Sequence, residues 1–89
     1  MAWIIKYSES ARKQLKKLNK QSAICILDFM DERISESENP RSIGKVLTGP
    51  KLGTYWRYRV GDYRLICDIQ DGQLCVLVIE IGSRKEIYR

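Results

Sequence analysis

Three arginines near the middle of the chain have a spacing suited to binding a phosphate group. Polar and apolar residues alternate from position 55 to 69, with a break at Gly61-Asp62, and this pattern predicts a β-hairpin with a two-residue turn. Side chains of paired strand residues share a face, so Arg57, Arg59 and Arg64 are predicted to project from one exposed side. Their guanidinium groups repel one another, and the one acid between them in the sequence, Asp62, belongs to the turn. A phosphate ligand explains such a cluster better than a structural role does.

The same hairpin has an apolar side. The turn sets the register, which pairs Val60 with Tyr63, Arg59 with Arg64, and Arg57 with Ile66. The side opposite the arginines is expected to supply core residues, namely Trp56, Tyr58, Val60, Tyr63, Leu65 and Cys67. Trp56 and Tyr58 are therefore interpreted as core residues rather than as platforms on which bases stack.

The composition favours an anionic partner and excludes several kinds of chemistry. The net charge is +5 and the chain contains no histidine, which removes the commonest general base and the commonest metal ligand. Cys25, Cys67 and Cys75 are odd in number and lack metal-binding spacing, so we expect buried free thiols in a reducing compartment. No metal ion or other cofactor is expected.

The length and the N-terminus predict one small domain away from membranes. A chain of 89 residues makes a single domain, which we assign to residues 1–89. The apolar run at the N-terminus is too short for a signal peptide, and no later segment could span a bilayer. We therefore expect a soluble cytoplasmic protein with no membrane partner.

The N-terminal half is expected to form a strand and a helical hairpin. Residues 3–7 read as a short strand, and Ser8 is a suitable N-cap for a helix over residues 9–18. A second helix over residues 22–37 has an apolar stripe that includes Leu27, and Asn39-Pro40 ends it. The first helix carries a run of basic residues on its outer faces, Arg12, Lys13, Lys16 and Lys17. This run is either a solvated face or a weaker second contact with RNA, through Lys13 and Lys17.

The C-terminal half completes an antiparallel sheet. Asp71-Gly72 predicts a second two-residue turn, which is followed by a nearly continuous apolar strand over residues 74–81. The fold class is therefore α+β, a small antiparallel sheet backed by a helical hairpin in the order β-α-α-β-β-β. Six basic residues and one acid lie between positions 41 and 64. Lys45, Lys51 and Tyr55 from this segment are candidate RNA contacts beside Arg59.

Two motifs resemble a known protein family. The segments from Trp56 to Arg64 and from Gly82 to Arg89, together with the order of elements, are similar to the RelE/ParE superfamily of bacterial toxins, and the RelE branch looks closest. The resemblance implies the toxin of a type II toxin–antitoxin pair. It further implies a metal-independent, ribosome-dependent endoribonuclease, or mRNA interferase. In such enzymes the ribose 2′-hydroxyl attacks the adjacent phosphate and leaves a cyclic phosphate and a 5′-hydroxyl.

The resemblance also assigns roles to residues. Arg64 matches the family's hairpin arginine, which stabilises the transition state, and Arg84 matches the arginine assigned to the leaving group. Tyr88 matches a C-terminal tyrosine that stacks against or orients the nucleotide, and Arg57 falls where RelE-like proteins often carry a basic residue. Tyr55 stands where some members have a second basic residue, which leaves the general base unassigned. Arg59 could instead pair with Asp62 or Asp68, and Tyr88 could simply pack the chain end onto the sheet.

The resemblance implies partners and leaves two other functions open. The expected partners are a cognate antitoxin, the ribosome with its mRNA, and operator DNA reached only through the antitoxin. One alternative is a ParE-like inhibitor of DNA gyrase without nuclease activity, although retention of Arg64, Arg84 and Tyr88 together argues against that branch. The other is a catalytically degenerate protein that acts only with its antitoxin as an operator co-repressor.

Overall fold

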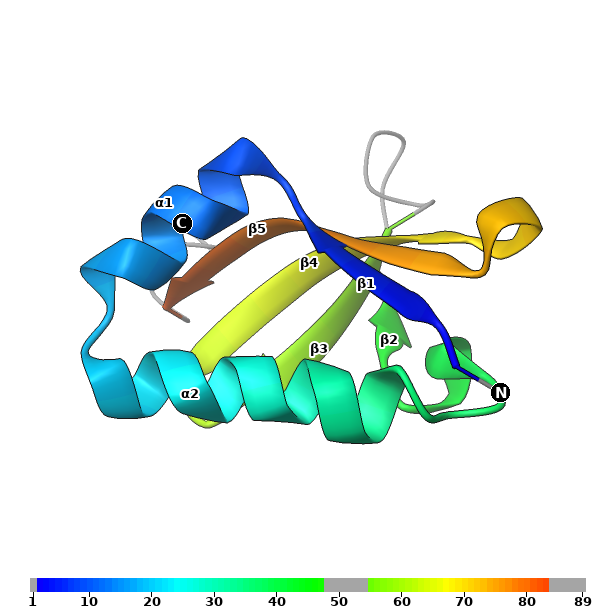
Figure 1. The fold of residues 1–89 in the computed structure, drawn as a ribbon, viewed down its shortest axis with the longest axis horizontal. Coiled ribbons are helices and arrows are strands. Elements are labelled where there is room, and N and C mark those ends of the chain that lie inside the picture. Colours follow the sequence, from blue (N-terminus) through cyan, green and yellow to red (C-terminus); the bar gives the residue numbers. More distant parts are fainter. Residues whose placement is uncertain (1, 48–54, 84–89) are drawn as a thin grey trace.

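Both helices pack on one face of a five-stranded sheet (Figure 1). The structure is a computed structural model that describes residues 2–47 and 55–83. Its helices and strands are β1 Ile4–Tyr7, α1 Glu9–Lys17, α2 Lys20–Phe29, β2 Lys45–Val46, β3 Trp56–Val60, β4 Tyr63–Gln70 and β5 Cys75–Ser83. Shorter segments are a π-helical turn that continues α2, Met30–Ile34, and two 3-10 helices, Pro40–Ser42 and Asp71–Gln73. None of the described helices is long and apolar enough to cross a membrane.

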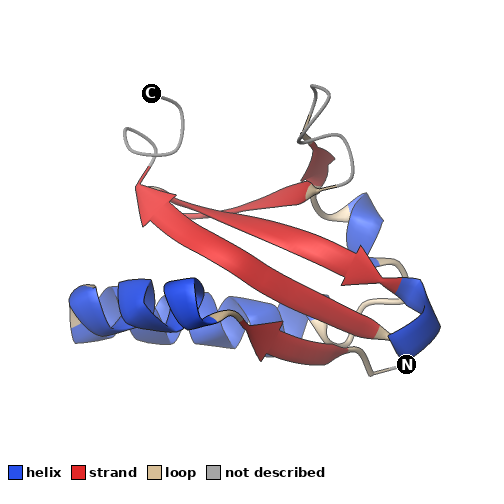
Figure 2. Ribbon diagram, turned by 90° about the horizontal axis from the view of Figure 1, so that it is seen from above, coloured by secondary structure: helices blue, strands red, loops and turns tan. Residues whose placement is uncertain are grey.

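The predicted α+β class and the helical hairpin are confirmed, but the sheet is mixed rather than antiparallel throughout. The strand order is β1-β5-β4-β3-β2, and β1 runs parallel to β5. A tight turn forces neighbouring strands to be antiparallel, whereas β1 leads into a helical hairpin and is free to join the far edge in either direction. The sequence pattern does not predict β2, whose two residues pair with β3. Seen from above, the two long helices lie on one side of the long strands (Figure 2).

Side-chain caps begin both helices. Ser8 Oγ accepts a hydrogen bond from Ala11 N at 3.0 Å and donates one to Ile79 O at 2.6 Å, so it caps α1 and ties it to β5. Asn19 Oδ1 accepts from Ser22 N at 2.8 Å, and α2 therefore begins at Lys20, earlier than predicted.

The core lies between the helices and the sheet. From α2 and its π-helical turn it receives Ile26, Met30 and Ile34, and Leu27 is exposed because the buried face of the helix is centred on Ile26. The apolar side of the hairpin was predicted correctly. Tyr58, Leu65 and Cys67 are buried, and Trp56, Val60 and Tyr63 pack against them.

The first hairpin has the predicted register, whereas the second connection is longer than predicted. Val60 pairs with Tyr63, as expected for a two-residue turn, and Gly61 has a φ of 59°, which glycine adopts without strain. In contrast, four residues connect Gln70 to its partner Cys75. Three of them form a 3-10 helix, and the left-handed conformation falls on Leu74, with φ 48° and ψ 47°, instead of on a glycine. A branched side chain is strained in that conformation.

Relief of this strain is testable. We expect Leu74→Gly to raise the free energy of unfolding by about 0.5–1 kcal/mol, because glycine removes the left-handed penalty at an exposed position. Urea unfolding followed by circular dichroism measures the change. Gln73→Gly is the matched control and should lower stability, because that residue is not in a left-handed conformation. Equal destabilisation by both substitutions would contradict the assignment of strain to Leu74.

Candidate functional site

The sheet face that points away from the helices, here called the open face, gathers four cations. Tyr58 and Leu65 point into the core, so their neighbours along each strand point to the open face. Arg59 pairs with Arg64 across β3 and β4, and Lys45 pairs with Arg57 across β2 and β3. Paired residues share a face. The resulting cation cluster consists of Lys45, Arg57, Arg59 and Arg64.

Close packing against β3 positions the segment that carries Lys45. The hydroxyl of buried Tyr58 donates a hydrogen bond to Pro40 O at 2.8 Å. A Cβ atom at Gly44 would lie 2.8 Å from Tyr58 Cε1 and 2.9 Å from Arg57 O, so only glycine allows this approach. Burial raises the pKa of Tyr58, which keeps its hydroxyl protonated and available as a donor. These contacts fix β2 at the edge of the open face.

Arg41 contributes to structure rather than to the cation cluster. Its Nη1 and Nη2 atoms donate to the two carboxylate oxygens of Asp71 at 2.8 and 2.7 Å. Its guanidinium carbon also lies 5.9 Å from the centre of the Trp56 ring. The hydrogen bond from Arg41 lowers the pKa of Asp71 and raises that of Arg41, so the pair stays charged. This clasp joins the segment before β2 to the connection between β4 and β5.

Arg64 is buried, which corrects the expectation that it leaves the sheet on an exposed face. Only 3% of its surface is exposed, and Nη1 lies 3.5 Å from Tyr63 O. Its partner on β5 is Gly82, which has no side chain and leaves room beside it. Arg59, on the other flank, is exposed. Within the described part of the chain Arg59 forms no ion pair, so neither Asp62 nor Asp68 is its partner there.

One acid on the open face was missed by the sequence analysis. The register between β4 and β5 shifts between Ile66 and Cys67, so that Glu80 pairs with Ile66. With the register of the preceding pairs continued, Glu80 would oppose Leu65 on the core face. The bulge therefore turns Glu80 to the open face and places Ile81 in the core. Glu80 is exposed, and it lies in the same row across the sheet as Arg57.

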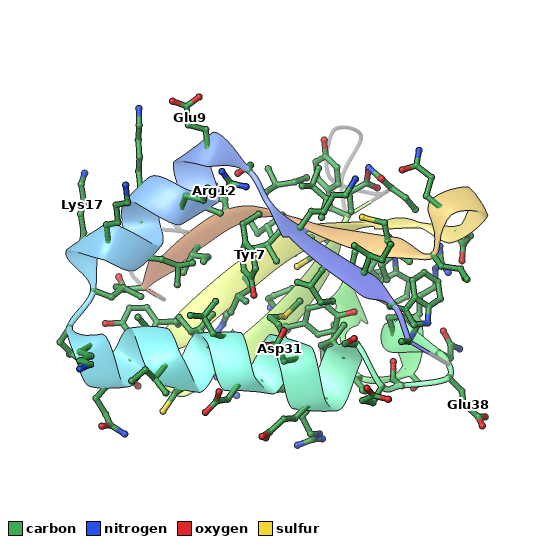
Figure 3. All side chains as sticks on the ribbon, viewed as in Figure 1. Tyr7, Glu9, Arg12, Lys17, Asp31 and Glu38 are labelled. Atoms are coloured by element: carbon green, nitrogen blue, oxygen red, sulfur yellow. The ribbon has the colours of Figure 1, made fainter. Side chains whose placement is uncertain are left out.

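The remaining predicted site residues are Tyr55 beside β3, two lysines on α1, and three residues outside the described part of the chain. Tyr55 is half-buried just before β3, and its carbonyl accepts from Leu47 N at 3.0 Å. Lys13 lies on α1, where its Nζ atom is 3.7 Å from Glu9 Oε1. Lys17, labelled in Figure 3, points outward from the same helix. Lys51, Arg84 and Tyr88 lie outside the described residues. Among the residues that are described, no three His, Cys, Asp or Glu side chains are grouped to hold a metal ion.

Comparison with known proteins identifies the family. A family model, described as the ParE toxin of the type II toxin–antitoxin system parDE, matches residues 5–88. The chain belongs to this family. Toxin RelG of Mycobacterium tuberculosis is 29% identical to this chain over 89 residues, which cover 100% of this chain and 99% of RelG. The predicted membership of the RelE/ParE superfamily is thereby confirmed.

Solved structures share the fold of the toxin. The toxin–antitoxin complex RelBE2 from Mycobacterium tuberculosis contains a chain with a TM-score of 0.84 and 25% identity, over 94% of this chain and 93% of that one. The intact Escherichia coli RelBE complex gives a TM-score of 0.72 at 23% identity, over 92% and 96% of the two chains. This second likeness is one of fold alone.

Burial of Arg64 predicts a cost to stability that Arg59 does not share. We expect Arg64→Ala to lower the free energy of unfolding by roughly 1–3 kcal/mol, because the packed stem of the side chain is lost. Arg59→Ala, its exposed cross-strand neighbour, should stay within about 0.5 kcal/mol of wild type. Chemical denaturation of the two variants beside wild type makes the comparison. Equal stabilities would show that the buried position of Arg64 contributes nothing to folding.

Proposed function

We propose that this toxin is a ribosome-dependent endoribonuclease that cuts mRNA in the cytoplasm. The observation that carries the proposal is the cation cluster, which the sheet register holds on one rigid face. Like charges placed side by side on paired strands destabilise a sheet. A polyanionic ligand relieves that repulsion, and phosphate groups bind guanidinium groups through paired hydrogen bonds.

The chemistry that we propose needs no nucleophile from the protein. The ribose 2′-oxygen attacks the adjacent phosphorus, and the protein must align the two atoms and stabilise the charge that develops on the phosphate oxygens. Arg64 suits the second task because its planar guanidinium can bind two phosphate oxygens at once. Lys45, Arg57 and Arg59 would bind the phosphates on either side, a contribution that falls as salt rises.

Two further residues enter the proposal through the family resemblance. Arg84 would help the 5′-oxygen to leave, and Tyr88 would stack against or orient a nucleotide. Ser83, the last residue of β5, pairs with Tyr63, the neighbour of Arg64. Arg84 therefore follows a residue that already lies at the Arg64 end of the sheet, which favours its assignment to the same site.

A second candidate function is inhibition of DNA gyrase without nuclease activity. The match to a family model named for ParE toxins favours it. The two candidates differ in what the cation cluster does, because only the nuclease needs a phosphate-binding arginine for a chemical step. Mapping of mRNA 5′ ends in a translating extract separates them, since a gyrase inhibitor generates no new 5′ ends.

The nuclease proposal predicts a rate effect at Arg64 that depends on the ribosome. Wild type should cut ribosome-bound mRNA and cut naked RNA very slowly. Arg64→Ala should lower the single-turnover rate by about 10²–10³, or ~3–4 kcal/mol, with little loss of ribosome affinity. Arg64→Lys should restore only part of this rate, because an ammonium group lacks the bidentate fork.

The measurement must separate catalysis from folding. Each variant is assayed well below its own unfolding transition, and ribosome binding is recorded alongside cleavage. Normal cutting by folded Arg64→Ala, or efficient cutting of naked RNA by wild type, would overturn the proposed role of this residue.

The proposal includes a cognate antitoxin, and the two solved structures named above are toxin–antitoxin complexes. Acidic segments of the antitoxin would cover the cation cluster. The toxin also exposes large apolar side chains, which are Ile4, Ile24, Leu27, Val46 and Leu74. We therefore expect an amphipathic antitoxin that combines apolar and electrostatic contacts.

The salt dependence of that complex tests the balance of contacts. The co-purified pair should stay associated in about 1 M salt, where the Debye length falls to ~3 Å and surface charges are screened. Size-exclusion chromatography at low and high salt reports the outcome. Dissociation near physiological salt would show that charge alone holds the antitoxin.

A further inference from the structure

Glu80 is the acid that β5 places on the open face next to the partner of Arg64. Arg64 pairs with Gly82, and Glu80 lies two residues before Gly82 on the same strand. Such diagonal neighbours are roughly 7–8 Å apart. Glu80 is exposed, and within the described residues its carboxylate forms no ion pair. A carboxylate with no ion pair among the described residues thus shares the open face with Arg64.

The proposed reaction needs a proton acceptor that the sequence analysis left unassigned. The chain has no histidine, and arginine is a poor acceptor because it stays protonated at accessible pH. A carboxylate is a common general base. In a reactive arrangement the attacking 2′-oxygen lies ~3–3.5 Å from phosphorus. Side chains on diagonal neighbours such as Glu80 and Arg64 can therefore reach the 2′-hydroxyl and the phosphate, respectively, at the same time.

We infer that Glu80 is the general base that takes the proton of the ribose 2′-hydroxyl, an assignment that rests on the proposed nuclease function. The bulge in β5 supports this role independently. It interrupts the pairing next to Ile66 and turns Glu80 away from the core, onto the same face as the cation cluster. Bulges of this kind commonly re-aim a side chain at a functional site.

Water is the one further reactant that this step needs. Glu80 accepts the proton, and the 2′-oxygen uses the freed electron pair to bond to phosphorus. The bond from phosphorus to the 5′-oxygen then breaks, and that oxygen takes a proton from water. Glu80 is exposed and returns its proton to solvent, so the products are a 2′,3′-cyclic phosphate and a 5′-hydroxyl.

A purely electrostatic role for Glu80 predicts the opposite result. If the carboxylate only offsets the cation cluster, its removal strengthens attraction for phosphates. Glu80→Gln would then bind ribosome-bound mRNA more tightly and cut it at least as fast as wild type. A general base instead contributes about 10²–10⁴ to the rate. The direction of the change therefore separates the two roles.

The experiment is single-turnover cleavage of ribosome-bound mRNA by wild type, Glu80→Gln, Glu80→Ala and a control, Asp68→Asn. Asp68 is also on the open face but lies four residues from Arg64 along β4, ~13 Å away, and its substitution removes the same charge. We expect Glu80→Gln to be slower by about 10²–10⁴ with undiminished binding, and Asp68→Asn to match wild type. Added formate, a small carboxylate, should restore part of the rate of Glu80→Ala.

Each outcome decides one claim. Cleavage by Glu80→Gln within a few-fold of wild type, or absence of formate rescue for Glu80→Ala, would overturn the assignment of Glu80 and leave the nuclease proposal standing. An equal loss in Asp68→Asn would also overturn it, because the effect would then follow charge rather than position. Failure of wild type to cut would overturn the nuclease function itself and the role of Glu80 with it.

Discussion

Pairing between β4 and β5 is the constraint on which the rest of the structure depends. These are the two longest strands, and β5 also receives β1 on its other side. The bulge in β5, opposite the step from Ile66 to Cys67, allows β5 to bury apolar side chains on both sides of it. Val78 lies in the core before the bulge and Ile81 lies in the core after it. The same shift turns Glu80 outward. The burial of Ile81 and the exposed position of Glu80 thus come from one irregularity.

Repulsion between the cations on the open face lowers the stability of the sheet, and burial of the core on the opposite face offsets this loss. Arg59 and Arg64 oppose each other directly, an arrangement that destabilises a sheet in the absence of a ligand. The opposite face buries Tyr58, Leu65 and Cys67 under the helices, so the strands cannot separate to relieve the repulsion. Under the proposed function, a cation cluster held in this way is organised before a phosphate arrives, and a bound anion would stabilise the folded toxin.

Polar contacts position β2 and the segment before it at the edge of the open face. Arg41 binds Asp71 with both terminal nitrogens and lies over Trp56, and the Tyr58 hydroxyl donates to Pro40 O. Exposed ion pairs contribute little to stability in general, but here a bidentate pair and an aromatic contact act on one short segment. Their effect is to place a strand of two residues, β2, where hydrogen bonds alone would hold it weakly.

The sequence by itself determined the features that depend on neighbouring residues. Alternation and the turn at Gly61-Asp62 fixed the register of the first hairpin, because a two-residue turn leaves only one pairing. Tertiary structure decided what depends on distant segments. The parallel direction of β1 follows from its pairing with β5, and the outward turn of Glu80 follows from the bulge between β4 and β5. A local pattern carries no information on where a bulge shifts that register. The position of Leu74 in a left-handed conformation was decided in the same way, because the strands on either side set the length of their connection.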